Sequence, residues 1–163
     1  AISVLRKKGA ARAQEKMNRE ASQGTVYAYI HMEGKLGVLV EVNCESDFVA
    51  RNDEFKELAK NIAMQIAAAN PRFVSSADIP EAELEQEKEI IRAQLQDIKK
   101  PPQIIEKIVE GKLKKFYEEV CLLDQPYIRD DKQTIQQIIA ATIAKFGENI
   151  KVRRFARFEL GKS

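Results

Sequence analysis

The sequence predicts an α+β fold, with a three-stranded antiparallel sheet covered by helices and a projecting antiparallel helical hairpin. Two strand-like runs stand close together early in the chain and a third ends it, whereas helical periodicity fills the residues between them. The chain has 163 residues, of which 44% are hydrophobic and 32% are charged, so it is long enough for one core domain with a helical appendage. We therefore expect a globular protein rather than a disordered one.

The first two strand-like runs are residues 25–32 (TVYAYIHM) and 36–43 (LGVLVEVN). Both are rich in β-branched and aromatic side chains, and the short turn between them contains Gly34, so we expect a β-hairpin. The second run is apolar at nearly every position. This pattern predicts the central strand of the sheet, covered by helices on one face and by another chain or segment on the other.

The last strand-like run, residues 149–160 (NIKVRRFARFEL), most simply pairs with that hairpin. Strict alternation along the run predicts that its side chains divide between two faces, with Arg154 interrupting the apolar one. The apolar face would carry Ile150, Val152, Ala156, Phe158 and Leu160, and the other would carry Lys151, Arg153, Phe155 and Arg157.

The residues between the strands have the spacing of amphipathic helices. Asn52 is the expected N-cap of the first helix, and its apolar residues are Phe55, Leu58, Ala59, Ile62, Ala63 and Ile66. Two charged helices within about residues 80–120 carry narrow apolar stripes, so they either project as an antiparallel hairpin or coat the core. Their predicted stripes include Leu84, Ile90, Ile91 and Leu95, then Ile104, Ile105, Ile108, Leu113, Phe116 and Val120. A loop at 122–133 (LLDQPYIRDDKQ) then leads to a helix at about 134–146.

Charge and composition argue against several classes of protein. A formal net charge of +2 makes no strong electrostatic case for nucleic acid or for an anionic membrane. No apolar stretch reaches the roughly 20 residues of a transmembrane helix, and the first ten residues do not resemble a signal peptide. We expect a cytoplasmic protein without membrane contact. Cys44 and Cys121 stand in no metal-binding or redox spacing and are expected to be two buried thiols.

The common motifs for catalysis and cofactor binding are missing from the sequence. The chain has one histidine and no phosphate-loop, dinucleotide-binding, metalloprotease or nucleophile-elbow motif. A site made of carboxylates alone is left open, but Asp130 and Asp131 are adjacent in a predicted loop and are more simply explained as helix-capping residues. We therefore expect a binding protein rather than an enzyme, with no cofactor and no metal.

Residues 45–52 (ESDFVARN) are unusual, because an aromatic residue stands in a polar connection between an apolar strand and a capped helix. Two interpretations are open: Phe48 packs under its own helix as a hydrophobic staple, or it is exposed and fills a partner's pocket. The basic final strand KVRRFAR, interleaved with Phe155 and Phe158, leaves a different function open. It would suit an RNA-binding or ribosome-associated module.

The stretch VEVNCESDFVARNDEF resembles the signature of the bacterial elongation factor Ts family, in which N-C-x-T-D-F-V follows a hydrophobic strand; here Ser46 replaces the usual threonine. LRKKGAARAQEK, EGKLGVLVEVNC, IVEGKLKKFYEEVCLLDQPYI and FGENIKVRRFARFELG resemble the same family in the same order. The resemblance is to the short form with a single core subdomain. Residues 1–23 resemble the trailing helix of an N-terminal region that is mostly missing, and residues 24–163 resemble the core and dimerisation domain, with the helical hairpin inserted at about 80–120.

This resemblance implies a guanine nucleotide exchange factor that promotes GDP release from the translational GTPase elongation factor Tu, without binding nucleotide itself. It also implies a homodimer, and no nucleic acid partner is expected. Some short-form relatives link their subunits through a cysteine in the last strand, where this chain has Ala156. The residues that match the family's contacts with elongation factor Tu are Asp47, Phe48, Val49, Phe146, Gly147, His31, Ile128 and Arg129. His31 is open to a second interpretation, as a strand histidine without special partners.

Overall fold

The structure is a computed structural model and describes residues 9, 11 and 13–162. The chain divides into two compact units, one formed by Ala1–Asn70 with Pro126–Ser163 and the other by Pro71–Gln125. Much of the helix expected within residues 1–23 lies outside the described residues; of those that are described, residues 9, 11 and 13–16 are helical. Among the described helices, none has the length and apolar character needed to cross a membrane.

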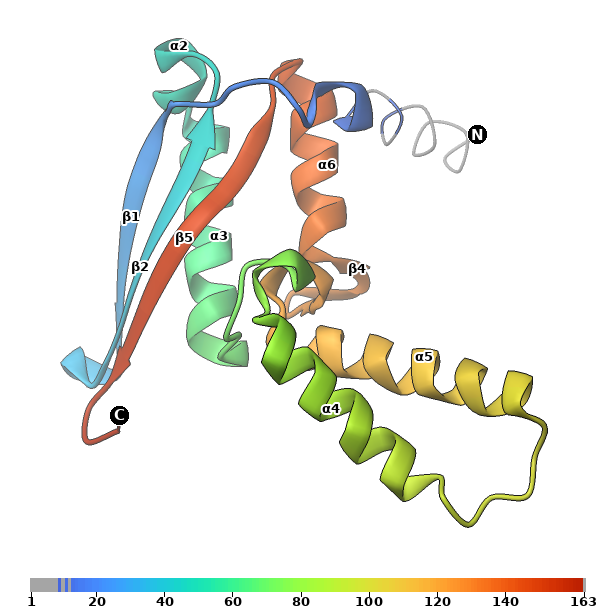
Figure 1. Cartoon of the computed structure of the whole chain (residues 1–163). Coiled ribbons are helices and arrows are strands. Elements are labelled where there is room, and N and C mark those ends of the chain that lie inside the picture. The colour runs from blue at the N-terminus through green and yellow to red at the C-terminus, as the bar shows by residue number, and fades with distance from the viewer. Residues whose placement is uncertain (1–8, 10, 12, 163) are drawn as a thin grey trace. The chain divides into compact units, whose positions relative to one another are not determined.

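The first unit contains a three-stranded antiparallel sheet in the order β1-β2-β5, which confirms the predicted α+β fold (Figure 1). β1 (Gln23–His31) and β2 (Leu36–Cys44) form the expected hairpin around a short 3-10 turn, η1 (Met32–Gly34). β5 (Ile150–Glu159) pairs with the other edge of β2. The central place of β2 follows from its nearly continuous apolar run, because a strand with neighbours on both edges is the most buried.

Two helices lie against the sheet in this unit, α3 (Asp53–Ala69) on β1 and β2, and α6 (Ile135–Phe146) on β5 (Figure 1). α3 begins where predicted, because the Asn52 side chain accepts a hydrogen bond from the Glu54 N–H. All six of its predicted apolar residues are buried. The core therefore lies between these helices and one face of the sheet.

The loop expected before α6 contains a small antiparallel hairpin, formed by β3 (Pro126–Tyr127) and β4 (Asp130–Thr134). A side chain of α3 holds it: the buried Gln65 donates to the Pro126 carbonyl and accepts from the Ile128 N–H. Such a tertiary contact leaves no periodic signal in the sequence.

The helix-capping role expected for Asp130 and Asp131 is wrong. Thr134 caps α6, since its hydroxyl accepts a hydrogen bond from the Gln137 N–H and the Gln137 side chain accepts one from the Thr134 N–H. Asp130 instead accepts from the Lys132 N–H within the β3–β4 hairpin.

The strict alternation expected along β5 is interrupted by a β-bulge. Glu41 of β2 pairs with Arg154, but the next residue, Val42, pairs with Val152, so Arg153 is an extra residue without a partner on β2. Because side chains alternate between faces, one extra residue exchanges the two faces for the rest of the strand.

The bulge corrects the predicted faces of β5. Phe155 and Arg157 pair with Val40 and Val38, which are buried under the helices, so these two residues belong to the helix-covered face. The residues wrongly expected to share a face with Ile150 and Val152 are Ala156, Phe158 and Leu160. The first two lie on the opposite face, where they pair with Leu39 and Gly37, and the exposed Leu160 follows the end of the strand.

The second unit contains two helices, α4 (Glu81–Gln94) and α5 (Pro102–Val120), flanked by the 3-10 turns η2 (Ser76–Asp78) and η3 (Leu122–Asp124). The helices pack against each other through one cluster of buried residues, Ile91, Leu95, Val109 and Leu113. A second cluster is centred on Ile79, Val120 and Cys121. Ile90 and Ile104 are exposed, so their expected places in the apolar stripes are wrong; Val109, which was not expected there, is buried.

Candidate functional site

The connection after β2 folds into a four-residue helix, α2 (Asp47–Ala50), which presents Phe48 to solvent. The Ser46 hydroxyl caps this helix by accepting a hydrogen bond of 3.2 Å from the Val49 N–H. Phe48 is 81% exposed, more than any other of the exposed large hydrophobic residues that the structure describes. The interpretation of Phe48 as a staple under its own helix therefore does not match the structure.

Val49 differs from its neighbour, although both belong to the predicted partner-binding set. Its side chain is only 3% exposed, and Ala50 after it is also buried. In this conformation Val49 fastens the turn to the core and presents almost no surface to a partner. The turn thus has one face that is anchored and one, carrying Phe48, that is free.

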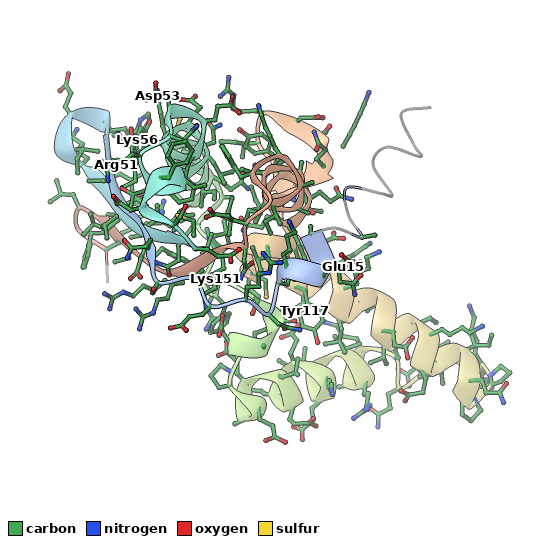
Figure 2. All side chains as sticks on the ribbon, turned by 90° about the horizontal axis from the view of Figure 1, so that it is seen from above. Glu15, Arg51, Asp53, Lys56, Tyr117 and Lys151 are labelled. Carbon is green, nitrogen blue, oxygen red and sulfur yellow. The ribbon has the colours of Figure 1, made fainter. Side chains whose placement is uncertain are left out.

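Charged residues flank Phe48 in the chain. Asp47 forms an ion pair with Arg51, four residues further along the chain. Arg51, Asp53 and Lys56 are all exposed at the beginning of α3 (Figure 2). A partner that receives Phe48 therefore meets both signs of charge around an apolar centre, which favours a specific orientation.

Phe146 and Gly147 lie near this turn because of the strand pairing. Gly147 ends α6 in the left-handed conformation, with φ of 72°, and its carbonyl accepts a hydrogen bond of 2.8 Å from Lys16 Nζ. The pairing of Cys44 with Ile150 brings the residues after Gly147 beside those after β2. Phe146 is half-buried. The structure thus brings two of the predicted contact segments together.

Ile128 and Arg129 form a separate part of the candidate site, in the β3–β4 turn. Arg129 donates a hydrogen bond of 3.1 Å to the Asn61 side chain of α3, and the Ile128 side chain is exposed. Asn61 lies eight residues after Asp53, so this turn is roughly 12 Å along α3 from the Phe48 end, at 1.5 Å per residue.

His31 is not part of either group. It pairs with Leu36 at the turn of the β-hairpin, whereas α2 follows the other end of β2. Eight residues of extended strand separate the two ends, or roughly 27 Å. The His31 ring stacks on Tyr29 of the same strand, whose hydroxyl lies 2.8 Å from Nδ1, and both interpretations of His31 stay predictions.

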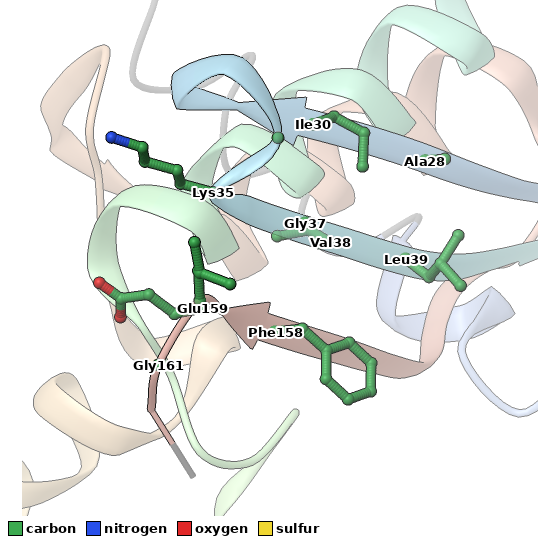
Figure 3. A pocket seen from close by; sticks show the side chains of 11 residues that line it. Ala28, Ile30, Lys35, Gly37, Val38, Leu39, Phe158, Glu159 and Gly161 are labelled. Carbon is green, nitrogen blue, oxygen red and sulfur yellow. The ribbon is translucent and has the colours of Figure 1, made fainter.

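A second exposed surface lies on the side of the sheet away from the helices, and we call it the open face. It carries apolar side chains from all three strands: Val26 (63% exposed), Ile30 (65%), Leu39 (49%) and Phe158 (74%). Ile30, Leu39 and Phe158 line a shallow hollow of about 610 Å³ (Figure 3). Exposed apolar area that spans several strands is typical of a protein interface.

The open face also carries a charged cluster around Glu41. Its carboxylate accepts hydrogen bonds from the Asn43 amide, Arg154 and Arg153. The hydrogen bond from Asn43 and then those from the arginines lower the pKa of Glu41 below its usual value, so the group stays ionised near neutral pH. The face is therefore apolar at the hairpin end and charged where the bulge lies.

The two cysteines are free and buried, as expected. Burial raises the pKa of each thiol to about 11, which keeps both protonated at neutral pH. Within the described part of the chain, no group of three or more His, Cys, Asp or Glu side chains is arranged to hold a metal ion.

Comparison with known proteins identifies the family. The family model for "Elongation factor TS" matches residues 2–162. The chain is 58% identical over 163 residues to an elongation factor Ts of Thermodesulfovibrio yellowstonii, and 60% identical over 159 residues to one of Coprothermobacter proteolyticus. These alignments cover 100% and 98% of this chain, and 81% of each relative.

The chain belongs to the elongation factor Ts family. The resemblance inferred from the ordered motifs is thereby confirmed over essentially the whole chain. As a member of this family it is a translation elongation factor and takes part in protein biosynthesis.

Sequence reasoning missed the contacts that the elongation factor Ts signature makes with a distant loop. The Glu148 side chain accepts from Ser46, and the Asn149 backbone N–H donates to Glu45, more than 100 positions earlier in the chain. Only the pairing of β2 with β5 brings them together. The one available signal was a run of polar and small residues between two apolar elements: Gly147, Glu148 and Asn149. An ordinary turn explains this run equally well.

Proposed function

We propose that this chain is a guanine nucleotide exchange factor that releases GDP from elongation factor Tu during the elongation phase of protein synthesis. We further propose that it acts by binding alone, with no catalytic residue, cofactor, metal or bound nucleotide of its own. The observation that carries the proposal is the 81% exposure of Phe48 on a short, capped turn within the family signature. An aromatic ring held in this way loses little conformational freedom when it enters a pocket.

Exchange requires only that the factor prefers one conformation of its partner. If Phe48 and Asp47 bind the state of the GTPase in which contacts to magnesium and phosphate are lost, mass action shifts the GTPase toward that state and GDP dissociates. The coupling is reciprocal, so nucleotide binding weakens the grip of the factor by the same ratio. That reciprocity allows GTP to displace the factor and complete the cycle.

The proposed contact set divides into a primary and two outlying parts. Phe48 with Asp47, next to Phe146 and Gly147, is the primary contact. Ile128 and Arg129 extend it along α3, and His31 would need a partner that reaches the far end of the sheet. A large GTPase with several domains meets this requirement, whereas a small ligand does not.

We also propose that the chain forms a homodimer through the open face. A second copy is the occupant that fits best, because the face carries Glu41 together with Arg153 and Arg154. A two-fold axis lets a surface with both signs of charge pair with itself. Ala156 pairs with Leu39 on this face, so the dimer would have no disulfide at that position.

Binding of RNA through the basic final strand is the alternative function. Several features of β5 weigh against it. Arg153 and Arg154 are paired with Glu41, and Arg157 donates to the Ala67 carbonyl on the helix-covered side. Only Phe158 of the two interleaved phenylalanines is exposed, and it lies in the apolar hollow rather than among the arginines.

The experiment that tests the proposed function is the release of a fluorescent GDP from elongation factor Tu with and without this chain. We expect the release rate to rise with the concentration of the chain, and an unchanged rate would contradict the proposal. A salt titration against single-stranded RNA separates the alternative. Binding that falls steeply with salt would support an RNA-binding module, since phosphate contacts release counterions.

A further inference from the structure

The carboxylate of Glu148 holds the entrance of the Phe48 turn. One of its oxygens, Oε1, accepts hydrogen bonds from the N–H of Glu45 (3.2 Å) and of Ser46 (2.9 Å). The other, Oε2, accepts from the Ser46 hydroxyl at 2.6 Å. The same hydroxyl oxygen accepts from the Val49 N–H, so an uninterrupted series of hydrogen bonds runs from Glu148 into α2.

These bonds matter because α2 cannot hold its shape alone. A helix of four residues is far below the length at which isolated helices are stable in water. Its orientation therefore depends on the buried Val49 side chain at one end and on the Ser46 cap at the other. Removing the carboxylate would leave two N–H groups and one hydroxyl without their charged acceptor, and hydrogen bonds to a charged acceptor are the stronger kind.

We propose that Glu148 is a positioning residue that holds Phe48 in its exposed, binding-ready orientation, an inference that rests on the proposed exchange function. Glu148 acts on the partner only through the turn: it fixes the Glu45 and Ser46 peptide groups, and these fix α2. Holding the aromatic side chain in place before binding lowers the conformational entropy lost on binding. Loss of Glu148 should then weaken the action of Phe48 while Phe48 itself remains present.

Asn149 provides a matched control next to Glu148. Its side-chain Nδ2 donates to the carbonyls of Met17 and Arg19, and among the described residues it forms no hydrogen bond with Asp47 or Phe48 of the turn. Its contact with Glu45 is made by the backbone N–H, which an alanine at position 149 retains. Asn149→Ala therefore removes buried hydrogen bonds from the same loop but leaves the acceptor for the turn intact.

The test measures GDP release from elongation factor Tu with Glu148→Ala, Glu148→Gln, Asn149→Ala, Phe48→Ala and the Glu148→Ala/Phe48→Ala double variant, all below their melting temperatures. We expect Glu148→Ala to slow release by about tenfold. Glu148→Gln should stay within about threefold, because its amide oxygen still accepts from both N–H groups. Asn149→Ala should lower the melting temperature and yet exchange within about twofold of the unmodified chain.

The double variant decides whether Glu148 acts through Phe48. If it does, Glu148→Ala should add less than about a twofold loss in the Phe48→Ala background, since residues that work as a unit are not additive. If the two single substitutions each slow GDP release and their effects multiply in the double variant, the inference is overturned. A loss in Asn149→Ala as large as that in Glu148→Ala would also overturn it, because the effect would then belong to the stability of the loop.

A readout without the partner separates this inference from the proposed function. Hydrogen exchange of the Ser46 and Val49 amides, followed by NMR in the free protein, should speed up in Glu148→Ala and stay slow in Glu148→Gln. Unchanged protection in Glu148→Ala would overturn the inference. Failure of the unmodified chain to speed GDP release would contradict the proposed function. A normal rate of GDP release by Phe48→Ala would instead contradict the role of Phe48, and with it the role of Glu148 in exchange. If Phe48→Ala slows GDP release and Glu148→Ala does not, only the positioning role of Glu148 is overturned.

Discussion

Two surfaces of the first unit that expose large apolar side chains differ in shape. After the end of β2, Phe48 is the one exposed apolar side chain of a four-residue turn, and the neighbouring Asp47 and Arg51 form an ion pair. On the open face, Val26, Ile30, Leu39 and Phe158 are spread over three strands, and all but Val26 line a shallow hollow. A single protruding ring fits a concave pocket, whereas a broad sheet face is covered only by another broad surface.

The two surfaces are also exposed for different structural reasons. Phe48 is exposed on a turn in which the Ser46 hydroxyl donates to Glu148 and accepts from the Val49 N–H, while the Val49 side chain is buried in the core. The exposure of the open face follows from a single layer of helices and from the bulge at Arg153, which places Phe158 outside. We therefore propose that the two surfaces bind two partners, the GTPase and a second copy of this chain, and expect that each can be damaged without the other.

The largest effect should come from a charge in the middle of the open face. Leu39→Asp places a carboxylate on the central strand of each subunit, and a two-fold dimer would bury two of them without partners. We expect the dissociation constant of the dimer to rise on the order of a thousandfold. Sedimentation or light scattering measures it, with the same result in reducing and non-reducing buffer.

Phe48→Asp is the matched control for this prediction, since it also places a carboxylate at an exposed apolar position. It should leave the dimer intact. A dimer that survives Leu39→Asp, or that is lost with Phe48→Asp, would break the assignment of the two surfaces.

Labelling of the Cys44 thiol tests whether solvent and reagents reach the residues beneath the Phe48 turn. Cys44 is buried, donates to the Ser46 carbonyl, and has its pKa raised by burial to about 11. In a Cys121→Ala variant, which leaves Cys44 as the sole thiol, we expect native labelling by a disulfide reagent at pH 8 to be about a hundredfold slower than in urea. Labelling at the unfolded rate would show that the turn opens freely.

The raised pKa of Cys44 also gives the sign of a stability effect. The protonated thiol is favoured in the folded state, so its contribution is fully present below the pKa of the unfolded thiol, near 9. It is lost as the pH rises toward 11. Between pH 9 and 11 the free energy of unfolding should therefore fall less steeply in Cys44→Ala than in the unmodified chain. An unchanged slope would contradict the raised pKa of Cys44.

The smallest effect should come from the second unit, which contains no residue of either surface. Replacing residues 90–114 with a short Gly-Ser linker removes the cluster around Ile91 and Val109 but keeps the one around Ile79 and Val120. The two clusters share no buried residue, and Leu84 and Tyr117, which pack against both, are retained. We therefore expect the melting temperature to change by less than about 5 °C and the dimer to remain. Loss of the whole fold by circular dichroism would show that these helices belong to the core.

The elements that could be predicted from the sequence are those whose signals lie within a few neighbouring residues. α3 combines a side-chain cap at Asn52 with six apolar residues at helical spacing, and both features act within a few residues of the chain. β2 is apolar at nearly every position, which is typical of a central strand. The signature around Phe48 was recognisable for the same reason, since its order of residues is local.

The parts that could not be predicted depend on residues far apart in the chain. Arg153 forms a bulge because of how β5 meets Glu41 and Val42, and no alternation pattern contains that information. The β3–β4 hairpin needs the side chain of Gln65, about 60 positions earlier. Glu148 reaches Ser46 across 102 positions. Phe48 and Val49 are both apolar, so residue type alone could not predict that the first is exposed and the second buried.

The measurement that tests the central claim most directly is GDP release from elongation factor Tu by Phe48→Ala, together with the melting temperature of the variant. Truncating a phenylalanine inside a core costs about 3 to 5 kcal/mol, but Phe48 is 81% exposed, so we expect the melting temperature to change by less than about 2 °C. A buried aromatic anchor of a complex is worth about 2 kcal/mol or more, so release should slow roughly thirtyfold.

Phe158→Ala is the control, because the same residue type is 74% exposed on the open face. Phe158→Ala should weaken the dimer, and its rate of GDP release per chain should stay within about twofold of that of the unmodified chain. If Phe48→Ala instead melts much lower than the unmodified chain and releases GDP at the normal rate when folded, Phe48 is a structural residue and the account is wrong.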